Sequence, residues 1–326
     1  MVIIGIDVSK TKLDCLWIRD LQAMKIKGKV QANTPAGHQA LLAWAMKQTG
    51  EDVSGLHFVM EATGVYHETL AYALHDAGAQ VSVVNPARVR DFARSLGAQT
   101  KTDKRDSVAI ARYGMTQSPR LWVPEPVEVR QLKALIARCD AIKQDIQREL
   151  NRLEKATASD ASEEVPASIE TVRSQLEAEK ARLESLIEDH IDNHPDLKND
   201  QVLLESIPGV GPVISQHMVA IIRSRSFKQA PQCAAFLGLI PVERQSGTSV
   251  YSPPRLSKHG DGRVRAKLYM AAVVATRYNP DIRRHYQRLL KNGKSKMSAI
   301  GAAMRKLVHI CFGVLKHQTP YQPQPA

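Results

Sequence analysis

The stretch VIIGIDVSKTKLDCLWIR, residues 2–19, decides the fold of the first third of the chain. Its apolar runs VIIGIDVSK and LDCLWIR have the residue types of β-strands and are close enough in sequence to pair, and KGKVQAN (residues 27–33) is a candidate third strand. Further apolar strands alternate with helical patterns; the strands are residues 56–64 and 79–86, and the helices are residues 35–48, 66–78 and 87–97. Strands that come first and then alternate with helices predict an α/β layer fold with a mixed sheet.

The composition indicates a folded chain of several domains. With 326 residues, 43% of them hydrophobic, the chain is long enough for two or three domains that each bury a core. Four widely separated cysteines show no metal-finger or disulfide spacing, which is typical of a reduced, intracellular protein. We find no signal peptide and no apolar window long enough to span a bilayer, so we expect a cytoplasmic protein without a membrane partner.

The positive charge is concentrated at the end of the chain. The net charge is +3 for residues 1–126, −6 for residues 127–200 and +15 for residues 201–326. A segment as basic as the last one repels itself unless a polyanion neutralises it, and nucleic acid is the usual polyanion. A membrane-surface protein is disfavoured because the sequence has no amphipathic anchor. We expect these three segments to be separate domains.

Residues 127–200 are expected to form a helical arm. Apolar residues recur every three or four positions from Leu132 to Leu153 and again from Ile169 to Leu186, with a polar, proline-containing break between the two runs. This pattern predicts two long helices in an antiparallel, coiled-coil-like hairpin. The arm is interpreted as a spacer or as an oligomerisation element.

Residues 201–326 are expected to form a mainly α-helical domain that begins with a helix-hairpin-helix. Two apolar helical stretches flank Pro208-Gly209-Val210-Gly211, where glycines let the backbone approach a phosphate and the next helix presents its first N–H groups. Such hairpins bind the DNA backbone without reading sequence, although a plain helical turn has the same pattern. The basic segment that follows is expected to be rich in loops, and the last residues, YQPQPA, are expected to be disordered.

Four acidic residues stand at positions that suggest a common role. Asp7 and Glu61 each end an apolar strand, where a charged side chain is unfavourable unless it is compensated. Asp103 and Asp106 are three residues apart, so on a helix they share a face with Cβ atoms about 5–6 Å apart. Helix capping by Asp103 is an alternative explanation of the second pair.

Clustered carboxylates repel one another, and a divalent cation offsets this repulsion. Oxygen ligands suit Mg²⁺ or Mn²⁺, and two such ions about 3.5–4 Å apart stabilise the attacking and leaving oxygens when a phosphodiester is cut. The basic residues beside the acids, Lys101, Lys104 and Arg105, would then hold DNA phosphates. Asp, Glu, Asp and Asp on a first strand, a later strand and a following helix resemble the arrangement of RNase H/RuvC-like nucleases.

The resemblance extends along nearly the whole chain. The transposases of insertion sequence family 110 contain, in the same order, stretches that resemble GIDVSKTKLD, EATGVYHETLAYAL, VVNPARVRDFARS, KTDKRDSVAIARY, SIPGVGPVISQHMVAII, AAFLGLIPVERQSGTS and SKHGDGRVRAKLYMAA. The resemblance implies a RuvC-like DEDD domain, a coiled-coil arm and a C-terminal transposase domain for the three segments defined above. Asp7, Glu61, Asp103 and Asp106 match the four acidic, metal-binding positions of the family.

The same resemblance selects a nucleophile. Ser246 precedes a glycine in a polar stretch, VERQSGTSVY, where Thr248, Ser249 and Ser252 are equally plausible by chemistry alone. In the family, the matching serine attacks the scissile phosphate and forms a covalent serine–DNA link. A hydroxyl needs a base or a metal for this attack, so the metal held by the acidic residues is the expected activator and His259 a remote candidate.

The family also implies partners. Its members resemble RNA-guided enzymes, in which a non-coding bridge RNA pairs with donor and target DNA. The resemblance also implies a dimer to tetramer that builds a composite site across protomers. Aromatic residues make up only 5% of the chain, which argues against a stacking-driven single-strand reader. The candidate contacts to nucleic acid in the last third are Gly209, Gly211, Arg244, Arg255, Lys258, Arg263 and Arg265.

The expected function is a bacterial, nucleoid-associated, Mg²⁺-dependent DNA recombinase that uses a serine nucleophile and acts as an oligomer with RNA. Two alternatives are left open. One is a structure-specific nuclease of the junction-resolvase type that uses water as the nucleophile. The other is a DNA-binding scaffold whose acidic residues are structural caps.

Overall fold

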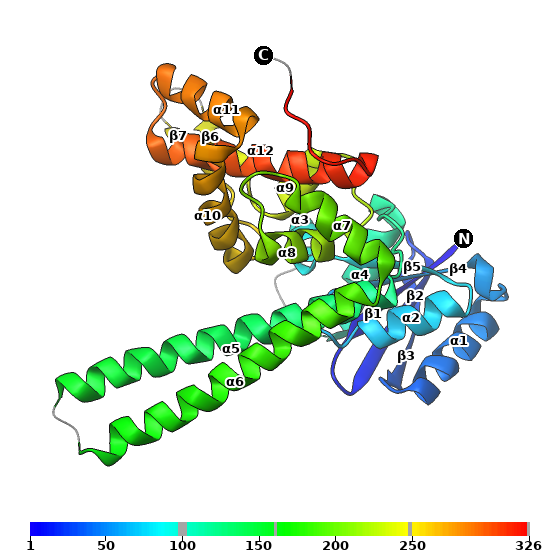
Figure 1. Ribbon diagram of the computed structural model, residues 1–326. Coiled ribbons are helices and arrows are strands. Elements are labelled where there is room, and N and C mark those ends of the chain that lie inside the picture. The colour runs from blue at the N-terminus through cyan, green and yellow to red at the C-terminus, as the bar shows by residue number, and fades with distance from the viewer. Residues whose placement is uncertain (97–102, 160–161, 247–249, 325–326) are drawn as a thin grey trace. The chain divides into compact units, whose positions relative to one another are not determined.

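The chain folds into two compact units, Met1–Pro124 and Glu125–Ala326, called here the N-terminal and C-terminal units (Figure 1). The computed structural model describes residues 1–96, 103–159, 162–246 and 250–324, and gives the backbone alone at residues 103–105, 244–246 and 250–253. The C-terminal unit contains both the predicted arm and the predicted transposase domain, whose separation into two domains stays a prediction.

The N-terminal unit is built on one mixed sheet of five strands. The strands are β1 (Val2–Val8), β2 (Lys12–Asp20), β3 (Lys25–Ala32), β4 (Leu56–Glu61) and β5 (Gln80–Val84), and they lie in the order β3-β2-β1-β4-β5. β1 pairs antiparallel with β2 and β2 with β3, whereas β1, β4 and β5 run parallel. This sheet confirms the predicted α/β domain with a mixed sheet.

Helices cover both faces of this sheet. α1 (Pro35–Thr49) and α2 (Glu68–Asp76) pack on the face that carries Ile4, Ile6 and Phe58, and a short 3-10 turn, η1 (Val53–Gly55), precedes β4. α3 (Pro86–Ser95) and α4 (Asp103–Gln117) pack on the opposite face, against Val59 and Leu16. A strand that is buried on both faces has an unbroken apolar sequence. β1 and β4 were therefore recognisable from the sequence.

The C-terminal unit begins with two long helices, α5 (Val127–Ala158) and α6 (Glu164–Asp192). They lie side by side and extend away from the other helices of this unit (Figure 1). At their base, Leu132 of α5 and Ile187 of α6 join the apolar core of the unit. The helical pair is as expected, whereas the supercoiling that defines a coiled coil stays a prediction.

The rest of the C-terminal unit is mainly α-helical around one apolar core. Leu204, Met218, Leu268 and Leu307 lie in this core, each from a different helix. The elements are α7 (Pro195–Glu205), α8 (Pro212–Arg223), α9 (Ala230–Phe236), β6 (Pro241–Ser246), β7 (Val250–Leu256), α10 (Gly262–Tyr278), α11 (Pro280–Lys291) and α12 (Lys296–His317).

The segment around Ser246 differs from the expected loop, because β6 and β7 pair as an antiparallel hairpin. Pro241, Pro253 and Pro254 made a loop the natural expectation, since proline cannot donate to a strand ladder. In a two-stranded sheet both strands are edges, where proline is tolerated. The expectation of a loop is therefore wrong for residues 241–246 and 250–256.

The C-terminal tail is held against the unit rather than disordered as far as residue 324. The Tyr321 hydroxyl lies 2.8 Å from Asp281 Oδ2 and 3.0 Å from Asn279 Oδ1, and the Gln324 amide lies 3.2 Å from Asp281 Oδ2. The expectation of disorder was wrong for residues 321–324, because the tail composition does not reveal a buried acceptor on another helix, and residues 325–326 lie outside the described residues.

One helix passes a length and composition test for a membrane span. α12 has a mean hydropathy of 1.4 over its most apolar 18 residues, so the expectation that no window is long enough was wrong. Of that window, 61% is buried inside the structure, and Ala303, Leu307 and Cys311 are in the core. α12 therefore packs as the central core helix of the C-terminal unit.

Candidate active site

Asp7 and Glu61 are neighbours at one end of the sheet of the N-terminal unit. In the parallel pair of β1 and β4, Ile6 lies opposite Met60, and Asp7 and Glu61 are the next residues along each strand. Successive side chains of a strand point to opposite faces, and Ile6 and Met60 belong to the core under α1 and α2. Asp7 and Glu61 therefore belong to the face that α4 covers.

α4 lies directly on β1. A Cβ built on Gly5 would come within 2.7 Å of the Ser107 carbonyl oxygen, and one built on Gly114 within 2.9 Å of Ile3 Cγ2. Because the later residue of α4 lies over the earlier residue of β1, the helix runs opposite to the strand. The first turn of α4 therefore reaches the end of β1 that carries Asp7.

That first turn supplies the other two acidic positions. Asp103 is the first residue of α4 and Asp106 follows three residues later, so the two share one side of the helix. Ser107 Oγ donates a hydrogen bond of 3.0 Å to the carbonyl oxygen of Asp14, the residue that pairs with Asp7 across β1 and β2. The structure thus brings the backbone positions of all four predicted acids to one end of one sheet face.

Asp14 is an acidic neighbour of this site that sequence reasoning did not identify. It is the antiparallel register partner of Asp7, so the two side chains share a face, and its Oδ2 lies 3.2 Å from Lys12 Nζ. Its side chain is only 17% exposed. Counting outward from a turn centred between Lys10 and Thr11 would have found it, since residues equidistant from a hairpin turn lie opposite each other.

The donor set at this end of the sheet consists of carboxylates. Carboxylate oxygens are the ligands of hard divalent cations such as Mg²⁺ and Mn²⁺, so the residue types fit the predicted metal. Among the described side chains, which do not include that of Asp103, no group of three or more His, Cys, Asp or Glu is close enough to hold an ion. The complete metal site therefore stays a prediction.

The predicted basic contacts next to the acids are only partly described. Lys101 lies outside the described residues, and Lys104 and Arg105 are described by their backbone, which belongs to the first turn of α4. Their role as contacts to DNA phosphates stays a prediction.

The predicted nucleophile lies at the tip of the hairpin in the C-terminal unit. Ser246 is the last residue of β6 and pairs in register with Val250 of β7, and Arg244 is two residues earlier in β6. Arg255 and Lys258 follow in and after β7 and are exposed, and Lys258 has a φ of 56°. The hairpin thus carries Ser246 and three predicted basic contacts within one short stretch of structure.

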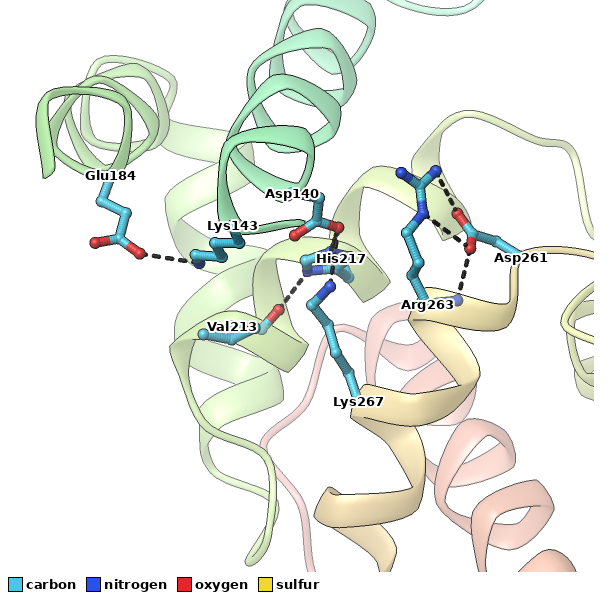
Figure 2. A network of polar contacts seen from close by, with 8 residues as sticks. All are labelled: Asp140, Lys143, Glu184, Val213, His217, Asp261, Arg263 and Lys267. Atoms are coloured by element: carbon cyan, nitrogen blue, oxygen red, sulfur yellow. Dashed lines mark hydrogen bonds and ion pairs between the residues drawn. The ribbon is translucent and has the colours of Figure 1, made fainter. Parts of the chain in front are cut away.

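Two other predicted contacts are engaged within the protein. The Arg263 guanidinium pairs with Asp261, with Nη2 and Oδ2 3.2 Å apart, and the same carboxylate caps α10 through the Arg263 amide (Figure 2). Burial alone would raise the pKa of Asp261, but the hydrogen bonds from Arg263 lower it. Arg265 Nη1 donates to the carbonyl oxygens of His259 and Gly260 at 3.1 and 3.0 Å, so it shapes the loop before α10.

The two glycines of the turn between α7 and α8 have different surroundings. Gly209 has a φ of +99°, and a Cβ there would come within 2.8 Å of Ala275 Cβ in α10, so packing and backbone conformation both require glycine. Gly211 directly precedes α8, and a Cβ there would meet no atom within 4 Å. Gly211 therefore leaves open space in front of α8, as the predicted phosphate contact requires.

A buried polar cluster in the C-terminal unit joins three helices, and sequence analysis did not identify it. Asp140 of α5 accepts hydrogen bonds from Lys267 Nζ of α10 at 2.8 Å and from His217 Nε2 of α8 at 3.2 Å (Figure 2). His217 Nδ1 lies 2.6 Å from the carbonyl oxygen of Val213. Burial alone would raise the pKa of Asp140, but these two partners hold it well below its ordinary value.

Two family models match the chain. Residues 4–158 match a model named for the DEDD transposases of IS110 and described as a transposase, and residues 201–287 match one described as the transposase IS116/IS110/IS902 family. The chain is similar to the pilin gene-inverting protein of Moraxella bovis, with 32% identity over 321 residues that cover 98% of this chain and 97% of that protein.

Further similarities cover less of the chain. An uncharacterized 42 kDa protein of insertion element IS900 from Mycobacterium paratuberculosis is 27% identical over 150 residues, which are 45% of this chain and 36% of that protein. Among solved structures, RuvC of Thermus thermophilus in complex with a Holliday junction substrate matches with 18% identity and a TM-score of 0.26, covering 37% of this chain and all of that one.

Proposed function

The chain belongs to the IS110/IS116/IS902 family of transposases, enzymes of DNA recombination, and from this premise we propose a specific way in which it cuts and rejoins DNA. The N-terminal unit holds a divalent cation through Asp7, Glu61, Asp103 and Asp106, and Ser246 of the C-terminal unit is the nucleophile. The observation that carries this proposal is the meeting of β1, β4 and the first turn of α4 at one end of the sheet.

The acidic residues position the ion that the reaction requires. When bound, Mg²⁺ or Mn²⁺ supplies positive charge that stabilises the developing charge on the phosphate oxygens. Asp7 and Glu61 are fixed by the sheet, while Asp103 and Asp106 are fixed by the packing of α4 on Gly5. A site built on a strand pair and a helix keeps its ligands in place without help from loops.

Ser246 supplies the attacking oxygen. Its Oγ loses a proton and forms a bond to the scissile phosphorus, the bond from phosphorus to the deoxyribose oxygen breaks, and that oxygen takes up a proton. The product is a serine–DNA phosphodiester, which conserves the bond energy needed for rejoining. Hydrolysis by water would lose that energy.

Similarity to a recombinase supports serine over water. The Moraxella bovis relative is named for gene inversion, a reaction in which every broken strand is joined again, and it is similar over 98% of this chain. A covalent serine–DNA intermediate keeps the phosphodiester energy available for rejoining, whereas hydrolysis by water loses it. A nuclease of the junction-resolvase type that uses water as the nucleophile is therefore the second candidate function.

The partners of the proposed reaction are donor DNA, target DNA and a non-coding bridge RNA. A net charge of +15 in residues 201–326 supports a polyanionic partner. Sequence choice by base pairing with RNA would account for a chain whose sequence shows no helix-turn-helix or zinc-finger signature. We further propose that a dimer to tetramer completes the site, with acids from one protomer and Ser246 from another.

Trapping the covalent intermediate tests this proposal. Purified protein, Mg²⁺, labelled donor and target DNA, and RNA transcribed from the DNA flanking the gene are mixed and resolved on a denaturing gel. The expected result is a labelled protein–DNA band that is absent with Ser246→Ala and present with Ser252→Ala. Cleavage by Ser246→Ala at the wild-type rate would overturn the serine mechanism and favour water.

A further inference from the structure

The last helices of the chain carry an unbalanced positive charge. Residues 282–326 contain nine Lys and Arg residues and no Asp or Glu. Most of these cations are on α11 and α12, which pack against each other (Figure 1). None of them is among the predicted contacts to nucleic acid, so the proposed function leaves this surface without a role.

Some of these cations are used by the protein itself. The Arg283 guanidinium donates to the carbonyl oxygen of Arg277, and Arg284 pairs with Asp281 and donates to the carbonyl oxygen of Gln324. These contacts explain two of the charges as structural.

Five side chains form what we call the basic seam between α11 and α12. They are His285 and Arg288 of α11 and Arg305, Lys306 and His309 of α12. All except the exposed Arg288 are half-buried. In the described part of the chain, Arg288, Arg305 and Lys306 have no carboxylate within ion-pair distance.

The members of the seam act on one another electrostatically. Burial lowers the pKa of His285, and the positive charges of Arg288 and Lys306 lower it further. Burial also lowers the pKa of His309, and Arg305 and Lys306 add to that effect. Lys306 acts on both histidines, so the five side chains share one electrostatic environment that links the two helices.

Among the described residues, the hydrogen bonding of the seam leaves its positive charge without a compensating anion. Arg288 Nη2 donates to His285 Nδ1 at 3.2 Å, a contact in which the histidine is the acceptor and offsets no charge. Half-buried cations without a counter-ion are unfavourable, and phosphate oxygens would supply both the charge and the acceptors.

We propose that the basic seam of α11 and α12 binds phosphates of duplex DNA. The choice of DNA rests on the family, whose members are transposases, and on the charge complementarity of the surface. The proposal deepens the proposed function, because it adds a DNA contact outside the residues assigned to cleavage. It depends neither on Ser246 nor on the bound ion.

Binding measured without catalysis tests the seam. Fluorescence anisotropy of a labelled 30-bp duplex is recorded with the full-length protein in EDTA at several KCl concentrations. We expect R288Q/K306Q, which removes both positive charges and keeps polar side chains, to weaken binding on the order of tenfold and to reduce the salt slope by about 2, since each neutralised phosphate contributes about 0.9. R148Q/R182Q in the arm removes two exposed, ion-paired cations and serves as the charge-matched control.

The outcomes separate this proposal from the cleavage mechanism. An unchanged affinity and salt slope for R288Q/K306Q, or an equal loss of affinity in the arm control, would overturn the proposal that the basic seam binds duplex DNA. Loss of binding to a 30-nucleotide RNA with duplex binding intact would also overturn it. Ser246→Ala is expected to keep seam-dependent binding, so a failure of the serine mechanism leaves this result untouched. Thermal unfolding of each variant confirms that it is folded.

Discussion

Gly5 of β1 and Ala111 of α4 are in such close contact that a Cβ on Gly5 would come within 2.5 Å of the Ala111 amide nitrogen. The neighbouring atoms belong to the backbone, so they cannot move aside as a flexible side chain would. This contact sets the distance between helix and strand. It therefore fixes the first turn of α4, with Asp103 and Asp106, relative to Asp7.

Gly5→Ala is expected to displace α4 and to misplace the acidic residues. A contact of 2.5 Å forces a backbone shift, and overpacking of this kind costs about 1–3 kcal/mol of unfolding free energy. DNA cleavage should fall by more than the folded fraction accounts for, as measured by urea unfolding and a cleavage assay on the same preparation. Gly28→Ala in β3 is the control, because its Cβ would meet only the Cys15 carbonyl oxygen, at 3.5 Å. Equal effects of both substitutions would contradict the argument.

Removal of the divalent ion is expected to abolish cleavage and to leave duplex binding intact. An ion that stabilises charge at the phosphate contributes several kcal/mol, so EDTA should slow cleavage by about a thousandfold or more. Asp7→Asn should have the same effect in the presence of Mg²⁺. Glu51→Gln, an exposed acidic residue elsewhere in the N-terminal unit, should cleave normally. Full cleavage in EDTA would exclude the carboxylate site as a metal centre.

Asp14→Asn is expected to weaken the response to Mg²⁺ without unfolding the protein. Asp14 pairs with Asp7 in register and is held by Lys12, so it is placed to orient its neighbour and to add negative charge. Outer residues of a metal site typically change affinity by about 10- to 100-fold. The Mg²⁺ concentration that gives half-maximal cleavage should rise by that factor. An unchanged Mg²⁺ dependence would show that Asp14 has only a structural role in the hairpin of β1 and β2.

Asp140→Ala is expected to destabilise the C-terminal unit strongly. The substitution leaves His217 and Lys267 facing each other without their shared counter-ion (Figure 2), and loss of one partner from a buried pair costs about 3–5 kcal/mol. Urea unfolding measures the effect. Glu184→Ala breaks the Lys143–Glu184 pair, whose side chains are 36% and 42% exposed, and should cost about 0–1 kcal/mol. A loss of similar size in both variants would show that the buried cluster stabilises the unit no more than an exposed ion pair does.

The sheet and its acidic end were predictable because local patterns report burial. β1 and β4 are buried on both faces and therefore read as apolar runs, and a charged residue at the end of each run stood out. The packing of these elements against one another was not predictable. That α4 lies on β1 follows from contacts at Gly5 and Gly114, and no pattern within either element contains that information.

Features formed by residues that are far apart in the sequence were not predicted, because patterns within one element do not report contacts with another. The cluster joins Asp140 to His217, 77 residues later, and to Lys267, 127 residues later, and each residue alone has the appearance of an ordinary polar side chain. The strand pairing around Ser246 was hidden by prolines that only an edge strand accepts. The docking of Tyr321 depends on Asp281, an acidic residue in the first turn of α11 that no local pattern links to the tail.

Tyr321→Phe is expected to lower stability at neutral pH and to remove an alkaline transition. Burial first, and then the hydrogen bond and charge of Asp281, raise the pKa of Tyr321 to about 12. A group whose folded pKa is raised above its ordinary value near 10 stabilises the fold fully below that value and loses the contribution as pH rises through about 12. The wild type should therefore lose about 1 kcal/mol of unfolding free energy between pH 10 and 12 relative to the variant.

The contribution of Asp281 to stability depends on pH in the opposite sense, being lost at low pH. The contact between Tyr321 and Asp281 can therefore be tested at both ends of the pH range. Burial alone would raise its pKa, but hydrogen bonds from Tyr321 and Arg284 lower it, so its contribution is present above the ordinary value near 3.8 and is lost as pH falls through the lowered one. Urea unfolding of Tyr321→Phe should converge with the wild type at both extremes. Tyr278→Phe, at a side chain that is 68% exposed, should follow the wild type throughout. A difference between wild type and Tyr321→Phe that stays constant with pH would mean that the tail is held by packing and not by this hydrogen bond.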